Sequence, residues 1–435
     1  MYLSETRSSD RARAAGPRSR RSLPRAAVSG TVLTLGLTSL VTDVSAEMLT
    51  AVLPVYLVTG LGLSMLQFGF LDGLYSGATA LLRVVGGYLA DRFTARKLVA
   101  ASGYALSAVT KLGFPLVGAS VPGIGLLLAA DRAGKGIRTA PRDALISLST
   151  APEHQGRAFG LHRAMDTVGA FIGPVVAFAL MRLLSTDRGT AYDAVFVVSF
   201  CIAVVGVAAL LLLVRDPFRA TRARPDGVSV RAGLRLTLRP VLGRPSLAAL
   251  LLGLATVSDS FVYLSLQQRT DLAIGWFPLL PLGTTGVFLL SAVPLGALAD
   301  RIGRRRILIA GHLLLALAYL LLTGAVPLGG RGLIITVLAL HGLFYGATDG
   351  VLMAHAGPLL PERLRTSGLS VLQTSQAFGR SVSSVAFGAV WAACGPVTAV
   401  RGFLVALLVA VAAAALLLGV RRKAAATDPV AGPWA

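Results

Sequence analysis

Long apolar stretches alternate with short polar segments along most of the chain. Each stretch is long enough to cross a bilayer as a helix, which takes about 20 residues. We expect twelve such helices, at residues 33–59, 68–90, 98–119, 122–141, 158–182, 192–214, 247–268, 275–298, 306–326, 332–356, 366–391 and 398–420. With 54% hydrophobic and 14% charged residues over 435 positions, the chain is predicted to be an all-α polytopic membrane protein.

The polar segments divide the chain into two blocks of six helices. The division predicts a disordered basic N-terminus at 1–30, a six-helix bundle at 31–214, a linker at 215–245, a second six-helix bundle at 246–422 and a tail at 423–435. The expected first helix is too long for the apolar core of a cleavable signal peptide, so we expect it to remain and to act as the insertion signal.

The positions of the charges explain the net charge of +21. Most of the 41 Lys and Arg residues fall in the N-terminus, the linker, the tail and the loops on the same side of the expected helices. By the positive-inside rule, both termini and the linker are cytoplasmic, and the protein is a multi-pass protein of the cytoplasmic membrane. The basic excess therefore predicts topology and contact with anionic lipid, not nucleic-acid binding. Arg greatly outnumbers Lys, a bias that suggests a bacterial source.

Three short patterns recur about half a chain apart. Gly87, Asp91, Arg92 and Arg96, between expected helices 2 and 3, recur between expected helices 8 and 9 as Gly296, Asp300, Arg301, Gly303 and Arg304. Pro152-Glu153 recurs as Pro361-Glu362, and Ser39 to Asp43 resembles Ala255 to Asp259. Repeats in register predict a duplicated architecture whose ligand site lies between the two halves near mid-membrane.

The second copy of the loop follows the pattern G-x-x-x-D-R-x-G-R-R and resembles the loop between helices 2 and 3 of major facilitator superfamily transporters. The first copy departs from it, with Thr94 and Ala95 where Gly and Arg are expected. The resemblance implies twelve helices in two six-helix bundles, alternating access, and loops that latch the cytoplasmic side closed. Asp91 and Asp300 would hold these latches through a loop arginine or a neighbouring helix N-terminus.

Acidic and basic residues occur together inside the expected helices. A lipid-facing charge near a helix centre costs about 2.5–3.5 kcal/mol, so these residues face a wet cavity or one another. For each of these charged residues, the alternative to a functional role is a structural one, as a partner in an ion pair that holds two helices together.

Asp43 and Glu47 are four residues apart in the expected first helix, so both project on one face. Two close carboxylates repel, which favours proton uptake by one of them. We expect this pair, with Asp259 as the counterpart in helix 7, to form the proton-coupling site.

Expected helix 4 carries Arg132 and Lys135, followed by Gly136. This segment resembles the R-x-x-Q-G pattern of proton-coupled members of the superfamily, with Lys in place of Gln. The cations suit proton handling or substrate binding. The alternative is a ladder of ion pairs with Asp166 and Arg163 of helix 5.

In the superfamily, helices 1, 4, 7 and 10 line the cavity. The resemblance therefore implies that His341 and Asp349 of helix 10 join the residues named above, and that Gln373, Gln376 and Arg380 approach from helix 11. Each lone histidine has the alternative of a hydrogen-bonded packing role.

Gly169, Gly173 and Pro174 in helix 5 resemble the antiporter motif of the superfamily, although the two glycines that usually follow are Ala177 and Phe178. Together with the segments around Asp43, Lys135 and His162, they resemble a prokaryotic branch whose substrates are largely unassigned. The resemblance implies export by antiport.

The sequence thus predicts a proton-coupled secondary transporter that exports a small polar or charged organic molecule, as drug or metabolite efflux. An uptake symporter or uniporter of the same fold is the alternative, and a non-transporting membrane receptor is the alternative of another class. The chain carries no H-E-x-x-H, P-loop, G-x-S-x-G or metal-type Cys/His cluster, so we expect no enzyme activity, metal or cofactor. We expect the protein to function as a monomer.

Overall fold

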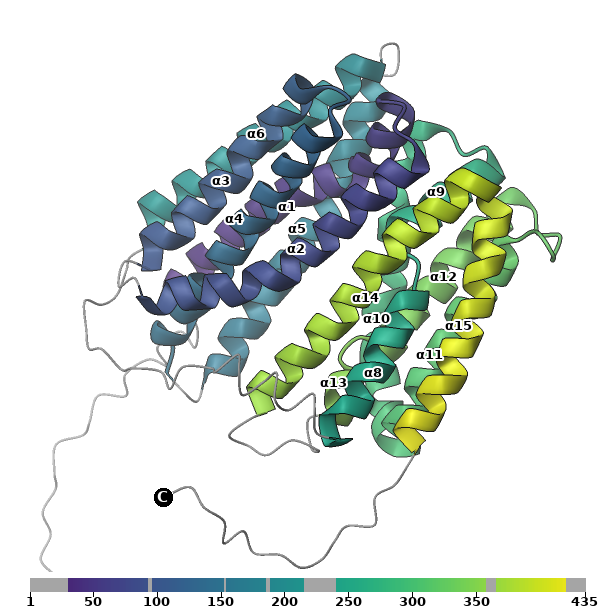
Figure 1. The fold of residues 1–435 in the computed structure, drawn as a ribbon. Coiled ribbons are helices and arrows are strands. Elements are labelled where there is room, and N and C mark those ends of the chain that lie inside the picture. The colour runs from purple at the N-terminus through teal and green to yellow at the C-terminus, as the bar shows by residue number, and fades with distance from the viewer. Residues whose placement is uncertain are drawn as a thin grey trace, which may run out of the picture.

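A computed structural model describes residues 30–92, 96–151, 154–184, 188–214, 240–356 and 365–419. The described residues form helices and connecting turns, arranged as two bundles that lie side by side (Figure 1). We call the end of the molecule at which the first bundle finishes at 214 and the second begins at 240 the linker end, and the opposite end the far end.

The first bundle contains six membrane-length rods, because each apolar segment is too hydrophobic to leave the bilayer and satisfies its backbone within a helix. The rods are α1 (Gly30–Val55) continued by the short π-helix η1 (Tyr56–Gly60), α2 (Met65–Arg92), α3 (Arg96–Val117), α4 (Val121–Leu148), α5 (Gln155–Leu183) and α6 (Arg188–Leu213).

The second bundle contains six further rods, three of them built from two pieces. They are α8 (Pro240–Ala255) with α9 (Asp259–Thr270), η3 (Ile274–Leu279) with α10 (Leu280–Ile302), α11 (Arg304–Leu322), α12 (Gly330–Thr348) with α13 (Val351–Ala356), α14 (Arg365–Cys394) and α15 (Pro396–Gly419). The prediction of twelve helices in two sets of six is confirmed. Helix α8 begins within the range expected for the linker.

Hydropathy alone accounts for eight of these rods in the described part of the chain. The rods outside that set are α2, α3, α4 and α14. Helix α4 carries Asp131, Arg132, Lys135, Arg138 and Arg142, which lowers its mean hydropathy. These charges are tolerated because they lie against other helices and not against lipid.

Helix packing in each bundle follows one scheme. Helix α1 packs on α5 and α6, and α4 packs on α2 and α3; in the second bundle α8 packs on α14 and α15, and α12 packs on α10 and α11. The two bundles meet chiefly where α2 contacts α14, and also where η3 and α10 contact α5.

Small residues permit the close contact between α2 and α14. A Cβ added at Gly73 would lie 2.6 Å from the carbonyl oxygen of Ser381, and at Gly388 it would overlap the carbonyl of Met65. Backbone contact of this kind is the usual basis of helix association in membranes. The glycines of α2 therefore determine how closely the two bundles approach.

Aromatic side chains join the bundles nearer the far end. The ring of Phe68 in α2 meets that of Phe261 in α9 at 4.9 Å, and Phe261 also meets Phe387 and Trp391 of α14. Phe178 of α5 lies 5.0 Å from Trp276 of η3. These contacts bury large apolar surfaces between the halves.

Candidate functional site

A cavity of about 430 Å³ lies between the two bundles, at the middle of the rods. Its lining comes from α1, α2, α9, η3, α10, α12 and α14, and includes the break between α8 and α9. Both bundles contribute side chains to the lining, so a molecule that fills the cavity contacts both halves. We call this space the central cavity.

Four carboxylates and one guanidinium group line the central cavity in the described part of the chain: Glu47, Asp72, Asp259, Asp349 and Arg380. Glu47 is half-buried, and its carboxylate has no hydrogen bond or ion pair with another described residue. Asp349 is exposed at the break between α12 and α13, and its carboxylate likewise lacks a partner among the described residues. Four of these five positions are among the site residues expected from the sequence.

Asp72 is the one charged residue of the described lining that the sequence prediction of the site left out. Its carboxylate accepts a hydrogen bond of 2.7 Å from the Ser384 hydroxyl of α14, so this bond crosses from one bundle to the other. The available signal was an acid one residue before Gly73, in a helix whose glycines allow close approach.

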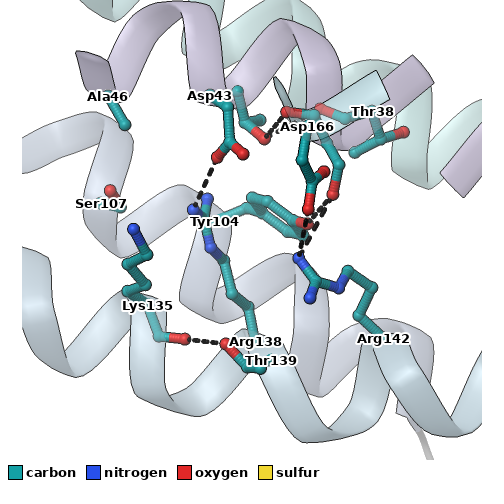
Figure 2. A network of polar contacts seen from close by, with 12 residues as sticks. Thr38, Asp43, Ala46, Tyr104, Ser107, Lys135, Arg138, Thr139, Arg142 and Asp166 are labelled. Atoms are coloured by element: carbon teal, nitrogen blue, oxygen red, sulfur yellow. Dashed lines mark hydrogen bonds and ion pairs between the residues drawn. The ribbon is translucent and has the colours of Figure 1, made fainter. Parts of the chain in front are cut away.

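Asp43 does not line the central cavity but belongs to a network of ion pairs in the first bundle (Figure 2). Arg138 Nη2 lies 3.4 Å from Asp43 Oδ1, and the guanidinium of Arg138 also stacks over the ring of Tyr104 at 4.3 Å. Arg142 lies 3.9 Å from Asp166 and 3.4 Å from the Ser39 hydroxyl. We call Asp43, Arg138, Arg142 and Asp166 the first-bundle network.

The ladder of ion pairs between helices 4 and 5, left open by the sequence, is present in part. Asp166 pairs with Arg142, and His162 Nε2 lies 3.6 Å from the same carboxylate. Arg163 is exposed and has no ion pair among the described residues. Asp166 is thus held in the first-bundle network and not at the central cavity.

Arg132 and Lys135 lie behind the cavity lining. Arg132 is buried and pairs with Asp131 at 2.5 Å, while its guanidinium stacks at 3.9 Å over Tyr75, a residue of the lining. Asp131 also accepts a hydrogen bond from Ser107. Lys135 lies beside Arg138 on α4 and points toward Ser107 (Figure 2). Both cations are therefore one layer removed from a molecule in the cavity.

A second polar network surrounds Asp259 at the start of α9. Tyr345 donates a hydrogen bond of 2.5 Å to Asp259 Oδ1, and His341 Nε2 lies 3.4 Å from the same atom. Arg380 donates to the Tyr345 hydroxyl at 3.3 Å. The carboxylate of Asp259 also lies at a helix N-terminus, where the backbone dipole stabilises negative charge. We call these four residues the second-bundle network.

The break between α8 and α9 leaves backbone groups without helical hydrogen bonds, and side chains of other helices bond to two of these groups. The Tyr319 hydroxyl accepts a 2.7 Å hydrogen bond from the amide of Val257, and Ser383 donates one of 2.8 Å to the carbonyl of Thr256. Non-helical backbone inside a membrane requires such partners. The break thus exposes a helix N-terminus to the cavity and positions Asp259 there.

The three residues expected to form the proton-coupling site are therefore not gathered at one point. Glu47 and Asp259 line the same cavity from opposite bundles, whereas Asp43 faces Arg138. Of the two glutamines expected from helix 11, Gln376 is half-buried, Gln373 is exposed, and neither lines the central cavity. His341 is buried behind Asp259.

The expected antiporter-like motif of α5 lies against α1. A Cβ at Gly173 would lie 2.6 Å from the Val44 carbonyl oxygen and 2.9 Å from Glu47 Cβ, and one at Gly169 would overlap the Leu40 carbonyl. Pro174 follows inside the helix. The motif therefore presses α5 directly onto the segment of α1 that carries Asp43 and Glu47.

The second loop repeat forms a compact turn at the linker end. Asp300 pairs with Arg304 at 2.8 Å, and Arg304 also donates to the carbonyl of Ala354 in α13. Gly303 has φ +105°, a backbone conformation that favours glycine, whereas Gly296 has open space around it. Arg301 is exposed. Asp300 thus meets a loop arginine, one of the two partners expected.

The first loop repeat lies largely outside the described residues. The backbone of Gly87, Asp91 and Arg92 belongs to α2, but their side chains are not among those described. Arg96 begins α3 and is half-buried.

A comparison of the chain with protein families decides its membership. The model of the Major Facilitator Superfamily matches residues 35–384 and 270–433. The chain belongs to the major facilitator superfamily. It is therefore a multi-pass membrane transporter, as the loop repeat indicated.

The chain is similar to proteins of Methanocaldococcus jannaschii and Photorhabdus laumondii. An uncharacterised MFS-type transporter of Methanocaldococcus jannaschii is 28% identical over 391 residues, covering 88% of this chain and 93% of that protein. The multidrug resistance protein MdtH of Photorhabdus laumondii is 32% identical over 130 residues, which cover 29% of this chain and 31% of that protein.

Solved structures of major facilitator transporters share the fold. The nucleoside transporter NupG matches with a TM-score of 0.74 at 13% identity, over 90% of this chain and 99% of that chain. A D-xylose–proton symporter matches with a TM-score of 0.66 at 15% identity, over 89% and 96% of the two chains. At these identities the similarity concerns the fold alone.

Proposed function

We propose that this major facilitator transporter exports a small polar or charged organic molecule from the cytoplasm in exchange for protons. In this proposal the linker end faces the cytoplasm, the central cavity opens to each side in turn, and a single chain is the working unit. The strongest support is the position of Glu47 in the cavity lining, where no described residue forms an ion pair with it.

Glu47 lines the cavity and forms no ion pair among the described residues, while the charges of Lys135 and Arg132 act on it from behind the lining. An ionised carboxylate in a membrane interior is costly unless a cation or a proton neutralises it. A proton and a positively charged or hydrogen-bonding cargo therefore compete for the same group. Competition of this kind suffices for antiport, because each ligand binds only after the other has left.

Asp43 extends the proposed proton pathway into the first bundle. It is one helical turn from Glu47 toward the linker end, and its partner Arg138 lies at 3.4 Å, a separation at the long end for an ion pair. Protonation of Asp43 would release Arg138, and the freed guanidinium would rearrange within the first-bundle network. We propose Asp259 as the corresponding acid on the second wall.

The direction of transport rests on α5. Its Gly169-x-x-x-Gly173-Pro174 segment resembles the antiporter motif and presses against α1 beside Glu47. The partial similarity to a protein named for multidrug resistance is consistent with export.

The loop turn at Asp300 supports the proposal of a latch at the linker end. Its ion pair with Arg304 and the bond from Arg304 to Ala354 tie α10, α11 and α13 together. Such surface contacts are weak enough to break and reform in each transport cycle.

Everted membrane vesicles with an acidic interior test the proposed exchange. A pH-sensitive dye reports protons released while cationic drugs, sugars, amino acids and organic anions are added in turn. We expect one class to release protons from wild-type vesicles and not from vesicles that carry Asp43→Asn or Glu47→Gln. Asp193→Asn, which changes an exposed acid of α6, is the matched control.

Two outcomes would contradict exchange. Proton release that is unchanged in both variants would separate these acids from coupling. Absence of any signal in everted vesicles, together with proton-driven accumulation in right-side-out vesicles, would indicate uptake symport by the same fold.

A further inference from the structure

The charges that line the central cavity do not balance. Its described lining contains four carboxylates, of Glu47, Asp72, Asp259 and Asp349, and one guanidinium group, of Arg380. Among the basic residues of α4, Arg132 is paired with Asp131 and Arg138 with Asp43. Lys135 lies behind the lining, where its charge acts on Glu47 and Asp43, so it offsets one of the four acids at most. The cavity surface is therefore negative whenever three or more of these acids are ionised.

The acids differ in what already satisfies them. Asp259 accepts from Tyr345 and faces His341, and Asp72 accepts from Ser384. Glu47 and Asp349 form no side-chain hydrogen bond or ion pair among the described residues, and Lys135 behind the lining is the cation that acts most on Glu47. Carboxylates that accept hydrogen bonds but lack an ion-paired cation leave room for a donor that brings positive charge.

Hydroxyl groups line the cavity beside the acids. Thr284 of α10 is 4% exposed and its side chain lies against that of Tyr263, which lines the same wall. A hydroxyl oxygen can accept a hydrogen bond from a ligand that carries polar hydrogens, such as an ammonium group.

Aromatic rings supply the rest of the wall. Tyr263, Phe277 and Phe288 line the cavity from the second bundle, and Tyr75 does so from the first. Faces of aromatic rings attract organic cations and repel anions, and they also bury apolar groups. The combination favours an amine carried on an apolar body over a sugar or an inorganic ion.

We propose that the cargo is an organic cation, held by Glu47 and Asp72 of the first bundle and by Asp349 and the aromatic wall of the second. This inference rests on the proposed transport function and narrows its cargo class. A cation between the two bundles neutralises acids on both walls. It would therefore favour the closure of the bundles around it.

Binding to the purified full-length protein tests the cargo class without a transport assay. The probes are tetraphenylphosphonium and tetraphenylborate, which have nearly the same shape and opposite charge, and the series benzylamine, benzyl alcohol and benzoate. The readout is the shift in melting temperature as a function of ligand concentration, since a ligand that binds only the folded state stabilises it. Primary amines, quaternary ammonium and guanidinium compounds complete the cationic group.

We expect cations to stabilise the wild-type protein and the matched neutral and anionic probes to have little effect. Glu47→Gln should weaken cation binding about 30-fold or more, as happens when one partner of a buried charge pair is removed. Glu47→Asp, which keeps the charge, should restore part of the affinity, and the control Asp193→Asn should bind as the wild type does. Asp72→Asn should also weaken binding.

Three results would overturn the cargo assignment: stabilisation by anionic or neutral probes alone, stabilisation by no cation of the panel, and cation binding that Glu47→Gln leaves unchanged. The vesicle assay separates this failure from that of the transport proposal. If anions or sugars release protons in an Asp43-dependent manner, proton-coupled export stands and the cation assignment falls.

Discussion

The two bundles use the same helix packing but neutralise the acids inside their helices differently. In the first bundle a Cβ at Gly169 of α5 would overlap the Leu40 carbonyl of α1; in the second, a Cβ at Gly379 of α14 would lie 2.7 Å from the Leu250 carbonyl of α8. Four residues later the bundles diverge. Gly173 presses against the Val44 carbonyl, whereas Ser383 donates a hydrogen bond to that of Thr256.

This divergence determines where each acid is placed. Helix α1 stays regular past Asp43, so that carboxylate has no free backbone amides nearby and relies on the guanidinium of Arg138. The second bundle breaks its helix, and Asp259 gains a helix N-terminus, a tyrosine hydroxyl and a histidine. The negative charge of Asp43 is therefore balanced by a guanidinium group, whereas that of Asp259 is balanced mainly by the dipoles of a helix N-terminus and a hydroxyl.

The largest difference is expected from removing the two acids. Asp43→Asn leaves Arg138 buried without its counter-charge, which should lower the free energy of unfolding by about 3 kcal/mol. Asp259→Asn leaves no charge stranded in direct contact and should cost about 1–2 kcal/mol. Unfolding in mixed micelles measures both. The double variant Asp43→Asn with Arg138→Gln should recover much of the loss, and equal costs for the two single variants would remove the distinction.

Hydroxyl deletion sharpens the contrast at the tyrosines. Tyr345→Phe removes the 2.5 Å donor to a carboxylate and should cost about 1.5–3 kcal/mol. Tyr104→Phe removes a 3.3 Å hydrogen bond to Ser39 but keeps the ring beneath Arg138, so about 0.5–1.5 kcal/mol is expected. The same unfolding assay compares them. A larger cost at Tyr104 would mean that the first bundle depends on dipoles as much as the second does.

The shared packing predicts equal effects at the glycines. Gly173→Ala and Gly379→Ala each force a helix away from its neighbour and should cost about 1–3 kcal/mol. Gly160→Ala is the matched control in α5, because a Cβ there meets open space and should stabilise the helix by about 0.5–1 kcal/mol. If only one of the two tight sites responds, the bundles do not pack by one scheme.

The smallest effect on stability is expected at the loop repeats. The side chain of Asp300 is 64% exposed, so Asp300→Asn should change the free energy of unfolding by less than about 1 kcal/mol. A latch role nevertheless predicts a lower transport rate with little change in cargo affinity, for this variant and for Asp91→Asn. Unchanged rates in both variants would reject that role.

The sequence predicted the rods well because eight of them are long apolar segments and the repeated patterns placed the more polar rods α2, α3, α4 and α14 between them. The resemblance to the superfamily implied that Glu47, Asp259, Asp349 and Arg380 lie around one cavity, and all four line it. It also implied Arg132 and His341, which do not line the cavity.

The sequence did not predict which residues of the two bundles occupy equivalent positions along their helices. The similarity of the segments ending at Asp43 and Asp259 suggested that these acids are counterparts. The glycine contacts instead align Leu40 with Leu250 and Asp43 with Gly253, so Asp259 lies further toward the far end. The break between α8 and α9 shifts the register of Asp259, and no periodic pattern in the sequence marks such a break. The hydrogen bond between Asp72 and Ser384 was not predictable either, because it depends on how the two bundles pack against each other.

Proton release on cargo binding tests the central claim, that Glu47 exchanges a proton for cargo in the central cavity. The purified protein, in weakly buffered solution with a pH-sensitive dye, receives the compound that the vesicle panel identifies. We predict about one proton released per bound cargo at pH values where Glu47 is protonated, and cargo affinity that rises with pH as this carboxylate ionises. The Glu47→Gln variant should release none. Equal proton release from the variant and the wild type, or cargo binding without release at any pH, would contradict the account.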